Sequence, residues 1–298
     1  MIPSRTMATQ ILCIAGPTAS GKSSRAVEEA LARDGEIISV DSRQVYRGLD
    51  IGTEKTSAQE MRGVPHYLID IRDPKEAYSA GDFVTDATRL IEDISARGKL
   101  PILVGGTHFY FDALLSGLPM VEMNQTLREE LEALPSEELL AQIREQDPRR
   151  AKELDPQNRR RLIRALEIIT ARGTVPARDT LNPYMVEWIV IDPPKEELCA
   201  RIDARLISAL GRGLIDEVRR VREAVGDTRL NELGLEYRIV GNYLNLEASL
   251  PIGSEASKLL PILSAKLWQY ARRQKAWLRK LGHHVSLATG TNNRISLN

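Results

Sequence analysis

The 298-residue sequence predicts an α/β fold in which helices flank a parallel sheet and an all-helical insertion interrupts the chain. Short apolar runs alternate with amphipathic helical patterns in the first part of the chain, as parallel strands joined by crossover helices do. Residues 124–173 contain only helical patterns, whereas the apolar run 188–192 again resembles a buried strand. We therefore expect a core formed by residues 1–120 and 185–298 and a helical insertion over residues 121–184.

The first predicted strand, residues 11–15, leads into a glycine-rich loop that fits the pattern G-x-x-x-x-G-K-[ST] and is followed by a helical pattern. Backbone N–H groups in such a loop converge on an anion, and the helix start adds its positive dipole end. We predict a P-loop NTPase-like core in which Lys22 reaches the outer phosphate and Ser23 ligates Mg²⁺. The loop by itself does not select ATP over another phosphate donor. Its residues are Gly16, Pro17, Thr18, Ala19, Ser20, Gly21, Lys22 and Ser23.

The other elements follow from the same periodicities. Further strands are expected at residues 36–40, 67–71 and 101–104. Helices are expected at residues 24–33, 79–98, 109–115, 194–210, 213–224, 235–246 and 255–281. Ser79, with Asp82 three residues later, is the expected N-cap of the second of these. In the last helix, Gln274 lies on an apolar stripe, so we expect a buried side chain with internal hydrogen bonds and a structural role.

Asp41 directly follows the second strand, which we expect to lie beside the phosphate-loop strand. Ligands of α/β sheets bind at the carboxyl ends of the strands, so Asp41 is a candidate functional carboxylate. The residues alone leave open a capping role or a Walker-B-like metal ligand for Asp41.

Composition is that of an ordinary globular protein, with 42% hydrophobic and 28% charged residues. No apolar run approaches the roughly 20 residues of a membrane span, and the N-terminal segment lacks a signal-peptide apolar core. We expect Cys13 and Cys199 to be buried thiols of a reducing compartment, and no Cys/His set has zinc spacing. These features predict a cytoplasmic protein that does not act in a membrane.

The formal net charge is zero, but the charges are segregated along the chain. Residues 149–173 contain eight basic residues against three acids, and residues 266–284 contain six Lys or Arg and no acid. Arg160 and Arg164 are four apart and share a helix face, which suits a phosphate backbone. Charge alone leaves open whether these stretches bind a polyanion or are solvated helix surfaces.

An ordered set of motifs extends over most of the chain and closely resembles the tRNA dimethylallyltransferases, the bacterial tRNA isopentenyltransferase family. The resemblance implies an enzyme that transfers a dimethylallyl group from dimethylallyl diphosphate to the exocyclic amine of the adenosine 3′ of the anticodon. The implied partners are the donor, Mg²⁺ and the anticodon stem-loop of tRNA, and we expect a monomer. The motifs are GPTASGKS at 16–23, VDSRQVY at 40–46, DIGTEK at 50–55, DIRDP at 70–74, VGGTHFY at 104–110, NRRRLIRALE at 158–167, RIDAR at 201–205 and ARRQKAW at 271–277.

The resemblance also implies roles for single residues. Asp41 would be the general base, Thr107 would contact the flipped adenosine, and Arg205 would hold the diphosphate from the side opposite the loop. One departure is Glu236, because many members have glycine before the Tyr-Arg or Tyr-Lys pair. The implied tRNA contacts are Asp41, Ser42, Arg43, Gln44, Thr107, Arg128, Arg160, Arg161, Leu162, Ile163, Arg164, Gly234, Tyr237 and Arg238.

The chemistry of this transfer matches the residue types. An adenine amine is a weak nucleophile that needs a base as the new bond forms, which suits Asp41. The leaving diphosphate is anionic, which suits Lys22, the loop amides, Mg²⁺ and Arg205. Two other functions remain open from the residues alone: an ATP-dependent small-molecule kinase with an arginine lid, and a non-catalytic nucleotide-dependent RNA-binding switch.

Overall fold

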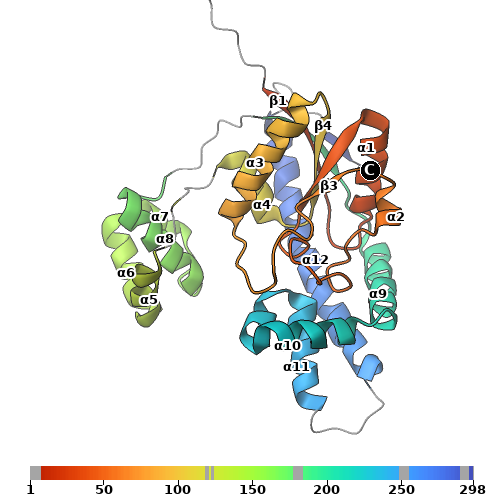
Figure 1. The fold of residues 1–298 in the computed structure, drawn as a ribbon. Helices are drawn as coiled ribbons and strands as arrows, with labels where there is room; N and C mark the ends of the chain where they lie inside the picture. The colour runs from red at the N-terminus through yellow and green to blue at the C-terminus, as the bar shows by residue number, and fades with distance from the viewer. Residues whose placement is uncertain are drawn as a thin grey trace, which may run out of the picture. The chain divides into compact units, whose positions relative to one another are not determined.

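The computed structural model describes residues 8–117, 121, 124–176, 184–247, 255–288 and 295–297 (Figure 1). The chain divides into two compact units, each described separately below. The core comprises Met1–Leu115 and Pro183–Asn298, and the insertion comprises Ser116–Asn182.

The core contains one sheet of six strands, all paired in parallel; the parallel arrangement is the predicted one, whereas the last strand was not among the five expected. In spatial order the strands are β3 (His66–Tyr67), β2 (Gly35–Val40), β4 (Leu100–Gly105), β1 (Thr9–Ala15), β5 (Tyr184–Val190) and β6 (Ile295–Leu297). Every residue of β2 is buried, and so are the last five residues of both β1 and β4. This burial on both faces explains why these strands are continuous apolar runs and not alternating patterns.

The strand order corrects one prediction. Strand β2, which Asp41 follows, does not lie beside β1, because β4 is inserted between them. The connection from β1 to β2 skips one position in the sheet, and the later strand β4 fills it. Two strands that are consecutive in sequence are therefore not always neighbours in the sheet. The acid that follows β5, a true neighbour of β1, is Asp192, and Asp192 is paired with Lys275 at 2.5 Å. Asp41 nevertheless lies at the carboxyl edge of the sheet.

The third strand is shorter than expected. It covers only His66–Tyr67, since Leu68 and Asp70 have φ values of 62° and 57°. Non-glycine residues in this left-handed region cannot continue an extended strand, and the chain turns there.

Helices cover both faces of the sheet (Figure 1). Buried residues of α1 pack with Leu12 and Ile14, whereas buried residues of α3 pack with Ile11 and Cys13. These alternate β1 side chains point to opposite faces, so α1 and α3 cover different sides. The core helices are α1 (Lys22–Arg33), α2 (Ala58–Met61), α3 (Ala80–Ala96), α4 (His108–Ser116), α9 (Lys195–Gly211), α10 (Leu214–Glu232), α11 (Leu235–Glu247) and α12 (Glu255–Ala288).

Local signals fix several helix ends. Ser79 and Asp82 form a capping box at the start of α3, where the sequence predicts a cap. Helix α10 continues to Glu232, beyond the expected end, through a non-helical Gly226 with φ 75°.

Cys13 is fully buried, as expected, whereas Cys199 is only partly buried.

The insertion has its own hydrophobic core, built from helices α5 (Gln125–Ala133), α6 (Ser136–Gln146), α7 (Pro148–Glu153) and α8 (Arg159–Arg172). Leu139, Ile143 and Leu162 are completely buried in it. Asp147 accepts hydrogen bonds from the backbone N–H of Arg150 and of Val175, which caps α7 and ties the end of the insertion to it.

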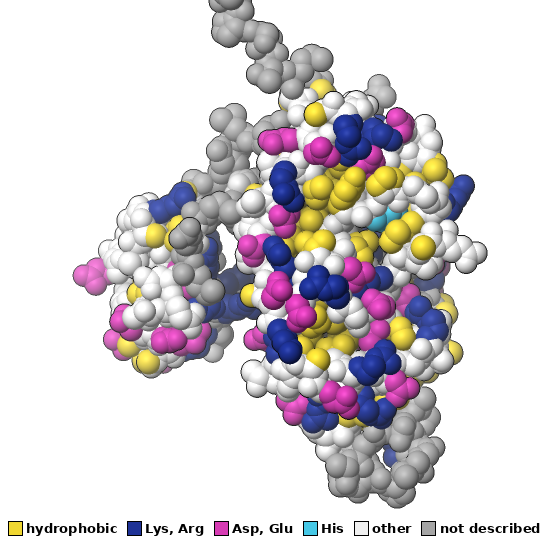
Figure 2. All heavy atoms as spheres, viewed as in Figure 1, with side chains coloured by type: hydrophobic (Ala, Val, Ile, Leu, Met, Phe, Trp, Pro, Cys, Tyr) yellow, Lys and Arg dark blue, Asp and Glu magenta, His cyan; other side chains and the backbone are white. Residues whose placement is uncertain are grey.

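Basic and acidic side chains alternate over the face of the core shown in Figure 2, without a continuous basic surface. Many charged side chains of the core form ion pairs about one helical turn apart, such as Arg219 with Asp216 and Arg229 with Glu232. Within the described part of the chain, no helix combines the length and apolarity needed to cross a membrane.

Candidate active site

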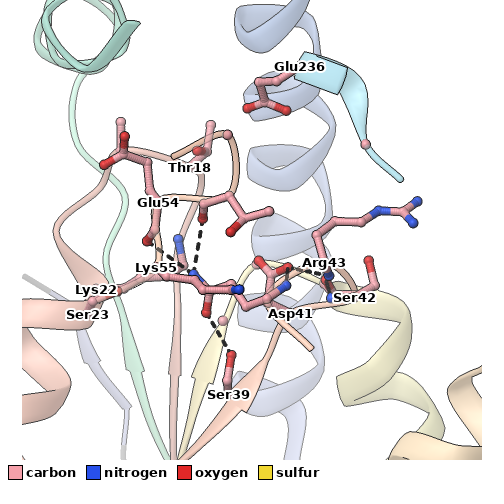
Figure 3. Close-up of a pocket in the computed structure, with 18 of the residues that line it drawn as sticks. Thr18, Lys22, Ser23, Ser39, Asp41, Ser42, Arg43, Glu54, Lys55 and Glu236 are labelled. Carbon is pink, nitrogen blue, oxygen red and sulfur yellow. Dashed lines mark hydrogen bonds between the residues drawn. The ribbon is translucent and has the colours of Figure 1, made fainter. Parts of the chain in front are cut away.

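A cavity of about 550 Å³ opens in the core at the carboxyl edge of the sheet. Its wall combines the loop after β1, the residues that follow β2 and β4, and side chains from α9, α11 and α12. Ligand sites of parallel sheets occur at this edge, where loops and helix N-termini converge. Figure 3 shows the charged and polar side chains that line the cavity.

The phosphate loop has the tightly curled backbone that its glycines predict. Ala19 and Gly21 have φ values of 60° and 87°, and α1 begins directly at Lys22. A Cβ on Gly16 would lie 2.8 Å from the carbonyl oxygen of Ile191, so only glycine fits where the loop passes the end of β5. The loop therefore presents backbone N–H groups and a helix N-terminus to the cavity.

Lys22 lies inside this loop, and its ammonium donates a 3.3 Å hydrogen bond to the carbonyl oxygen of Pro17. Burial lowers the pKa of Lys22 to about 8, although the nearby carboxylate of Asp41 opposes that shift. A buried ammonium with so few acceptors gains strongly from an incoming anion, because the anion restores the hydrogen bonds lost with water.

Gln274 on α12 holds the phosphate loop in place. Its Oε1 accepts the N–H of Thr18 at 2.8 Å, and its Nε2 donates to the carbonyl oxygen of Gly106 at 3.0 Å. The side chain is 2% exposed, so the predicted internal hydrogen bonding of Gln274 is confirmed. A Cβ on Gly106 would lie 2.4 Å from Nε2, which explains the glycine at that position.

Asp41 is oriented by its own turn. Its Oδ1 accepts the backbone N–H of Arg43 at 2.8 Å and that of Gln44 at 3.3 Å. Among the described residues, Oδ2 accepts no hydrogen bond, and the carboxylate borders the cavity (Figure 3). The hydroxyl of Thr107 accepts the N–H of Ser42 at 3.2 Å, which links the ends of β2 and β4. One oxygen of Asp41 is thus fixed and the other is available to a ligand.

Arg205 reaches the same cavity from α9. Its guanidinium donates to the hydroxyl of Thr18, to the carbonyl oxygen of Gly52 at 3.3 Å and to Oε1 of Glu236 at 3.2 Å. The structure therefore brings Lys22, Asp41, Thr107 and Arg205 together around one cavity.

Two residues predicted to contact RNA make contacts within the core. Tyr237 is 1% exposed and its hydroxyl donates to Glu217 at 2.6 Å. The amide of Gln44 accepts from Ser39 and donates to the carbonyl oxygens of Thr53 and Glu54. The hydroxyl of Tyr237 and the amide of Gln44 are thus engaged within the core, and the predicted contact of these two residues with tRNA stays a prediction.

Sequence reasoning missed Glu217, the buried carboxylate that orders this loop. It accepts the backbone N–H groups of Asp50, Ile51 and Gly52 at 3.0, 2.8 and 2.9 Å. A Cβ on Gly52 would lie 2.8 Å from the ring of Tyr237, so glycine is required where the loop crosses that ring. Glu217 is more than 160 residues away in sequence from the loop that it holds, and no local pattern in the sequence indicates this pairing.

In the insertion, the predicted RNA-contacting residues divide into two groups. Arg164 donates to Glu167 at 2.8 Å and to the carbonyl oxygen of Val121 at 3.0 Å, and Arg128 pairs with the same Glu167 at 3.4 Å. The side chain of Glu167 is only 1% exposed, whereas those of Arg164 and Arg128 are 42% and 27% exposed, so both arginines pair with a buried carboxylate while remaining partly open to solvent.

Four neighbouring residues of α8 divide into two with buried and two with exposed side chains. The side chains of Leu162 and Ile163 are buried in the insertion core, so direct side-chain contact with RNA is wrong for them. Arg160 and Arg161 are exposed, and the described part of the chain offers neither an ion-pair partner. Of the other arginines of the motif, Arg159 donates to backbone carbonyl oxygens of α5, and Arg164 is paired with Glu167 although its side chain is 42% exposed.

A phosphate-binding loop that faces a carboxylate and an arginine at the edge of a parallel sheet defines a phosphate-dependent enzyme of the P-loop type. Comparison with known proteins sharpens this class. The family model for IPP transferase matches residues 44–281. The chain therefore belongs to the IPP transferase family.

The relatives of this chain carry consistent names. It is 42% identical over 288 residues to a tRNA dimethylallyltransferase of Roseiflexus castenholzii, covering 93% of this chain and 92% of the relative. It is 40% identical over 282 residues to the tRNA dimethylallyltransferase of Thermomicrobium roseum, covering 91% and 84%. Such identity extends across both the core and the insertion.

Solved structures agree with the fold. A tRNA isopentenylpyrophosphate transferase of Bacillus halodurans superposes with a TM-score of 0.67 at 35% identity and covers 97% of this chain and 90% of its own. A eukaryotic dimethylallyltransferase acting on tRNA superposes with a TM-score of 0.79 at 27% identity, over 91% of this chain and 70% of its own. The fold of this chain is therefore that of these tRNA-modifying transferases.

Proposed function

We propose that this protein is a tRNA dimethylallyltransferase that modifies the exocyclic amine of the adenosine 3′ of the anticodon and releases diphosphate. The observation that supports this most directly is the single cavity that Lys22, Arg205 and Asp41 line together. Anion-binding groups and a candidate base thus border the same space. The names of the relatives give the transferred dimethylallyl group and tRNA as the substrate class, and the diphosphate donor and the acceptor adenosine are part of the proposal. We further propose that it acts in the cytoplasm.

The donor we propose is dimethylallyl diphosphate. The phosphate loop supplies backbone N–H groups and Lys22, and Arg205 supplies a guanidinium from the other side of the cavity. A diphosphate satisfies these groups without a nucleoside, because none of them reads a base or a ribose. The allylic chain of the donor needs only a slot without charge.

In the transfer step, the carbon–oxygen bond of the donor breaks and its electron pair leaves with the diphosphate. The lone pair of the adenine amine forms the new carbon–nitrogen bond, and the amine proton passes to Oδ2 of Asp41. Lys22 and Arg205 stabilise the charge that develops on the leaving oxygens. Thr107, linked to Ser42, borders the side of the cavity where the adenine would enter.

Mg²⁺ is the cofactor we propose, with the hydroxyl of Ser23 as its protein ligand. Ser23 is the second residue of α1 and lines the cavity beside Lys22. Among the described residues, no group of three or more His, Cys, Asp or Glu is placed to form a metal cage. One hydroxyl is sufficient, because Mg²⁺ retains waters and takes its remaining ligands from substrate phosphates. When bound, the ion would neutralise charge on the diphosphate.

For tRNA, we propose that Arg160 and Arg161 of the insertion contact the phosphate backbone, since both are exposed and unpaired among the described residues. In the core, Ser42, Arg43, Gly234 and Arg238 line the cavity and are the proposed contacts near the acceptor base. A base in an anticodon loop is unstacked before it can enter such a cavity, at a cost lower than in a duplex.

Mass spectrometry of an anticodon stem-loop RNA tests this proposal. The purified protein is incubated with the RNA, Mg²⁺ and either dimethylallyl diphosphate or ATP. We expect the allylic donor to increase the RNA mass by one five-carbon prenyl group, and ATP to leave it unchanged. The same RNA with guanosine replacing the acceptor adenosine is the matched control and should gain no mass. Phosphate transfer from ATP, with no prenyl transfer from the allylic donor, would replace this proposal with a kinase.

A further inference from the structure

The cavity holds more negative charge than anion binding requires. Besides Asp41, its walls include the carboxylates of Glu54 and Glu236 (Figure 3). Glu236 is in the first turn of α11, and its side chain is 13% exposed. Because a buried carboxylate is costly, its position inside an anion-binding cavity calls for a physical reason.

Glu236 is directly bound to the arginine that faces the phosphate loop. Its Oε1 accepts from Nη2 of Arg205 at 3.2 Å, whereas Glu54 lies farther from the same guanidinium, at 3.8 Å. Burial raises the pKa of Glu236, and Arg205 opposes that shift. In the structure, Glu236 is thus the nearest anion to Arg205.

Arg205 does not depend on Glu236 for its position. The hydroxyl of Thr18 and the carbonyl oxygen of Gly52 also accept from its guanidinium, and both are neutral groups whose backbone N–H groups are bound by Gln274 and Glu217. When Glu236 loses its charge, Arg205 therefore keeps its hydrogen bond to Thr18 of the phosphate loop. The cavity also becomes more positive by one unit.

We propose that Glu236 is an internal counter-anion of the donor site, which occupies Arg205 in the empty cavity and competes with diphosphate for it. This inference rests on the proposed function only for the identity of the diphosphate; the competition itself follows from the geometry. When diphosphate enters, Arg205 turns from the carboxylate to the phosphate oxygens, and the two anions then repel each other at short range. Glu236 thereby weakens diphosphate binding and promotes release of the product.

The matched test is calorimetric binding of inorganic diphosphate, in the presence of Mg²⁺, to the full chain. Glu236→Gln keeps the shape and one acceptor oxygen but removes the charge. Glu223→Gln removes the same charge from an exposed position of α10 outside the cavity. We expect Glu236→Gln to bind diphosphate about tenfold more tightly than the unaltered protein, and Glu223→Gln to bind it unchanged.

The two other outcomes overturn the proposal. Weaker binding by Glu236→Gln would make Glu236 a positioning residue for Arg205, and unchanged binding would limit it to stabilising the start of α11. Thermal unfolding of the variant identifies a loss of fold, which would appear as weaker binding together with a lower melting temperature. In that case Glu236→Asp, which keeps the charge and shortens its reach to Arg205, should also bind diphosphate more tightly.

A double variant distinguishes competition for Arg205 from charge repulsion between Glu236 and diphosphate. In an Arg205→Ala background, Glu236→Gln should change diphosphate affinity much less than it does alone, because the contested guanidinium is absent. An undiminished gain would overturn the role assigned to Arg205. Failure of the prenyl transfer assay would refute the proposed function but leave these binding results interpretable, since inorganic diphosphate needs no turnover.

Discussion

The core and the insertion each contain a glutamate paired with arginine, partly buried in the core and fully buried in the insertion, and the two pairs differ in what surrounds them. In the core, Arg205 and Glu236 are 3.2 Å apart on the wall of a cavity. In the insertion, Arg164 and Glu167 are 2.8 Å apart, and Glu167, at 1% exposure, also holds Arg128. The first guanidinium lines a cavity that an anion can enter, whereas those of Arg164 and Arg128 share one buried carboxylate outside any such cavity of the core.

This difference teaches how an arginine should be assigned a role. The number of arginines in a motif indicates positive charge, but the packing around each guanidinium decides whether an anionic partner can reach it. On α8, Arg160 and Arg161 are exposed while Arg164, three positions further, is held by Glu167. The predictions below test this division, from the largest expected effect to the smallest.

Asp41→Asn tests whether the cavity is catalytic as well as anion-binding. The change keeps the shape and the Oδ1 acceptor but removes the basicity of Oδ2, so we expect turnover to fall about 10²–10⁴-fold. Single-turnover prenyl transfer to a stem-loop RNA measures the rate, and RNA binding, measured in parallel, should be largely kept. A loss below about threefold would mean that Asp41 is not the base.

Arg205→Ala tests whether the arginine that lines the cavity binds the donor. The loss of a charged hydrogen-bond donor to the diphosphate should weaken donor binding about 10–100-fold, while the fold of the core is kept. Arg219→Ala is the matched control, since Arg219 is half exposed and paired with Asp216 on α10. Equal donor KM values for the two variants would show that Arg205 does not hold the donor.

Glu167→Gln tests the paired arginines of the insertion. It removes the charge that both Arg164 and Arg128 contact, and we expect the local stability of α8 to fall by about 1–3 kcal/mol. Native-state hydrogen exchange of the α8 amides measures this change without requiring the whole chain to unfold. Unchanged protection would show that these contacts contribute little and that the arginines are free to act elsewhere.

The sequence predicted the parts of the molecule that depend on local patterns. The parallel sheet, the phosphate loop and the capping box at Ser79 follow from periodicity and short motifs, and Gln274 follows from one polar residue on an apolar stripe. Strand order was not predictable in this way, because the place of β4 between β2 and β1 is set by packing across the sheet.

The burial of residues in the predicted RNA-contacting set has two different physical origins. Leu162 and Glu167 carried a usable signal, since an apolar side chain and an acid three residues after Arg164 indicate a core position and an ion pair. Tyr237 carried no such signal, because its burial depends on Glu217 and on the loop at Gly52, which are distant in sequence.

The salt dependence of stem-loop RNA binding, compared between Arg160→Ala and Arg164→Ala, tests the division of arginines most directly. Arg160 is exposed and Arg164 is held by Glu167, although both lie on α8. We expect Arg160→Ala to flatten the slope of log affinity against log salt by up to about one unit, and Arg164→Ala to leave the slope unchanged while lowering the protection of α8 amides. The account is contradicted if Arg164→Ala flattens the slope and Arg160→Ala does not.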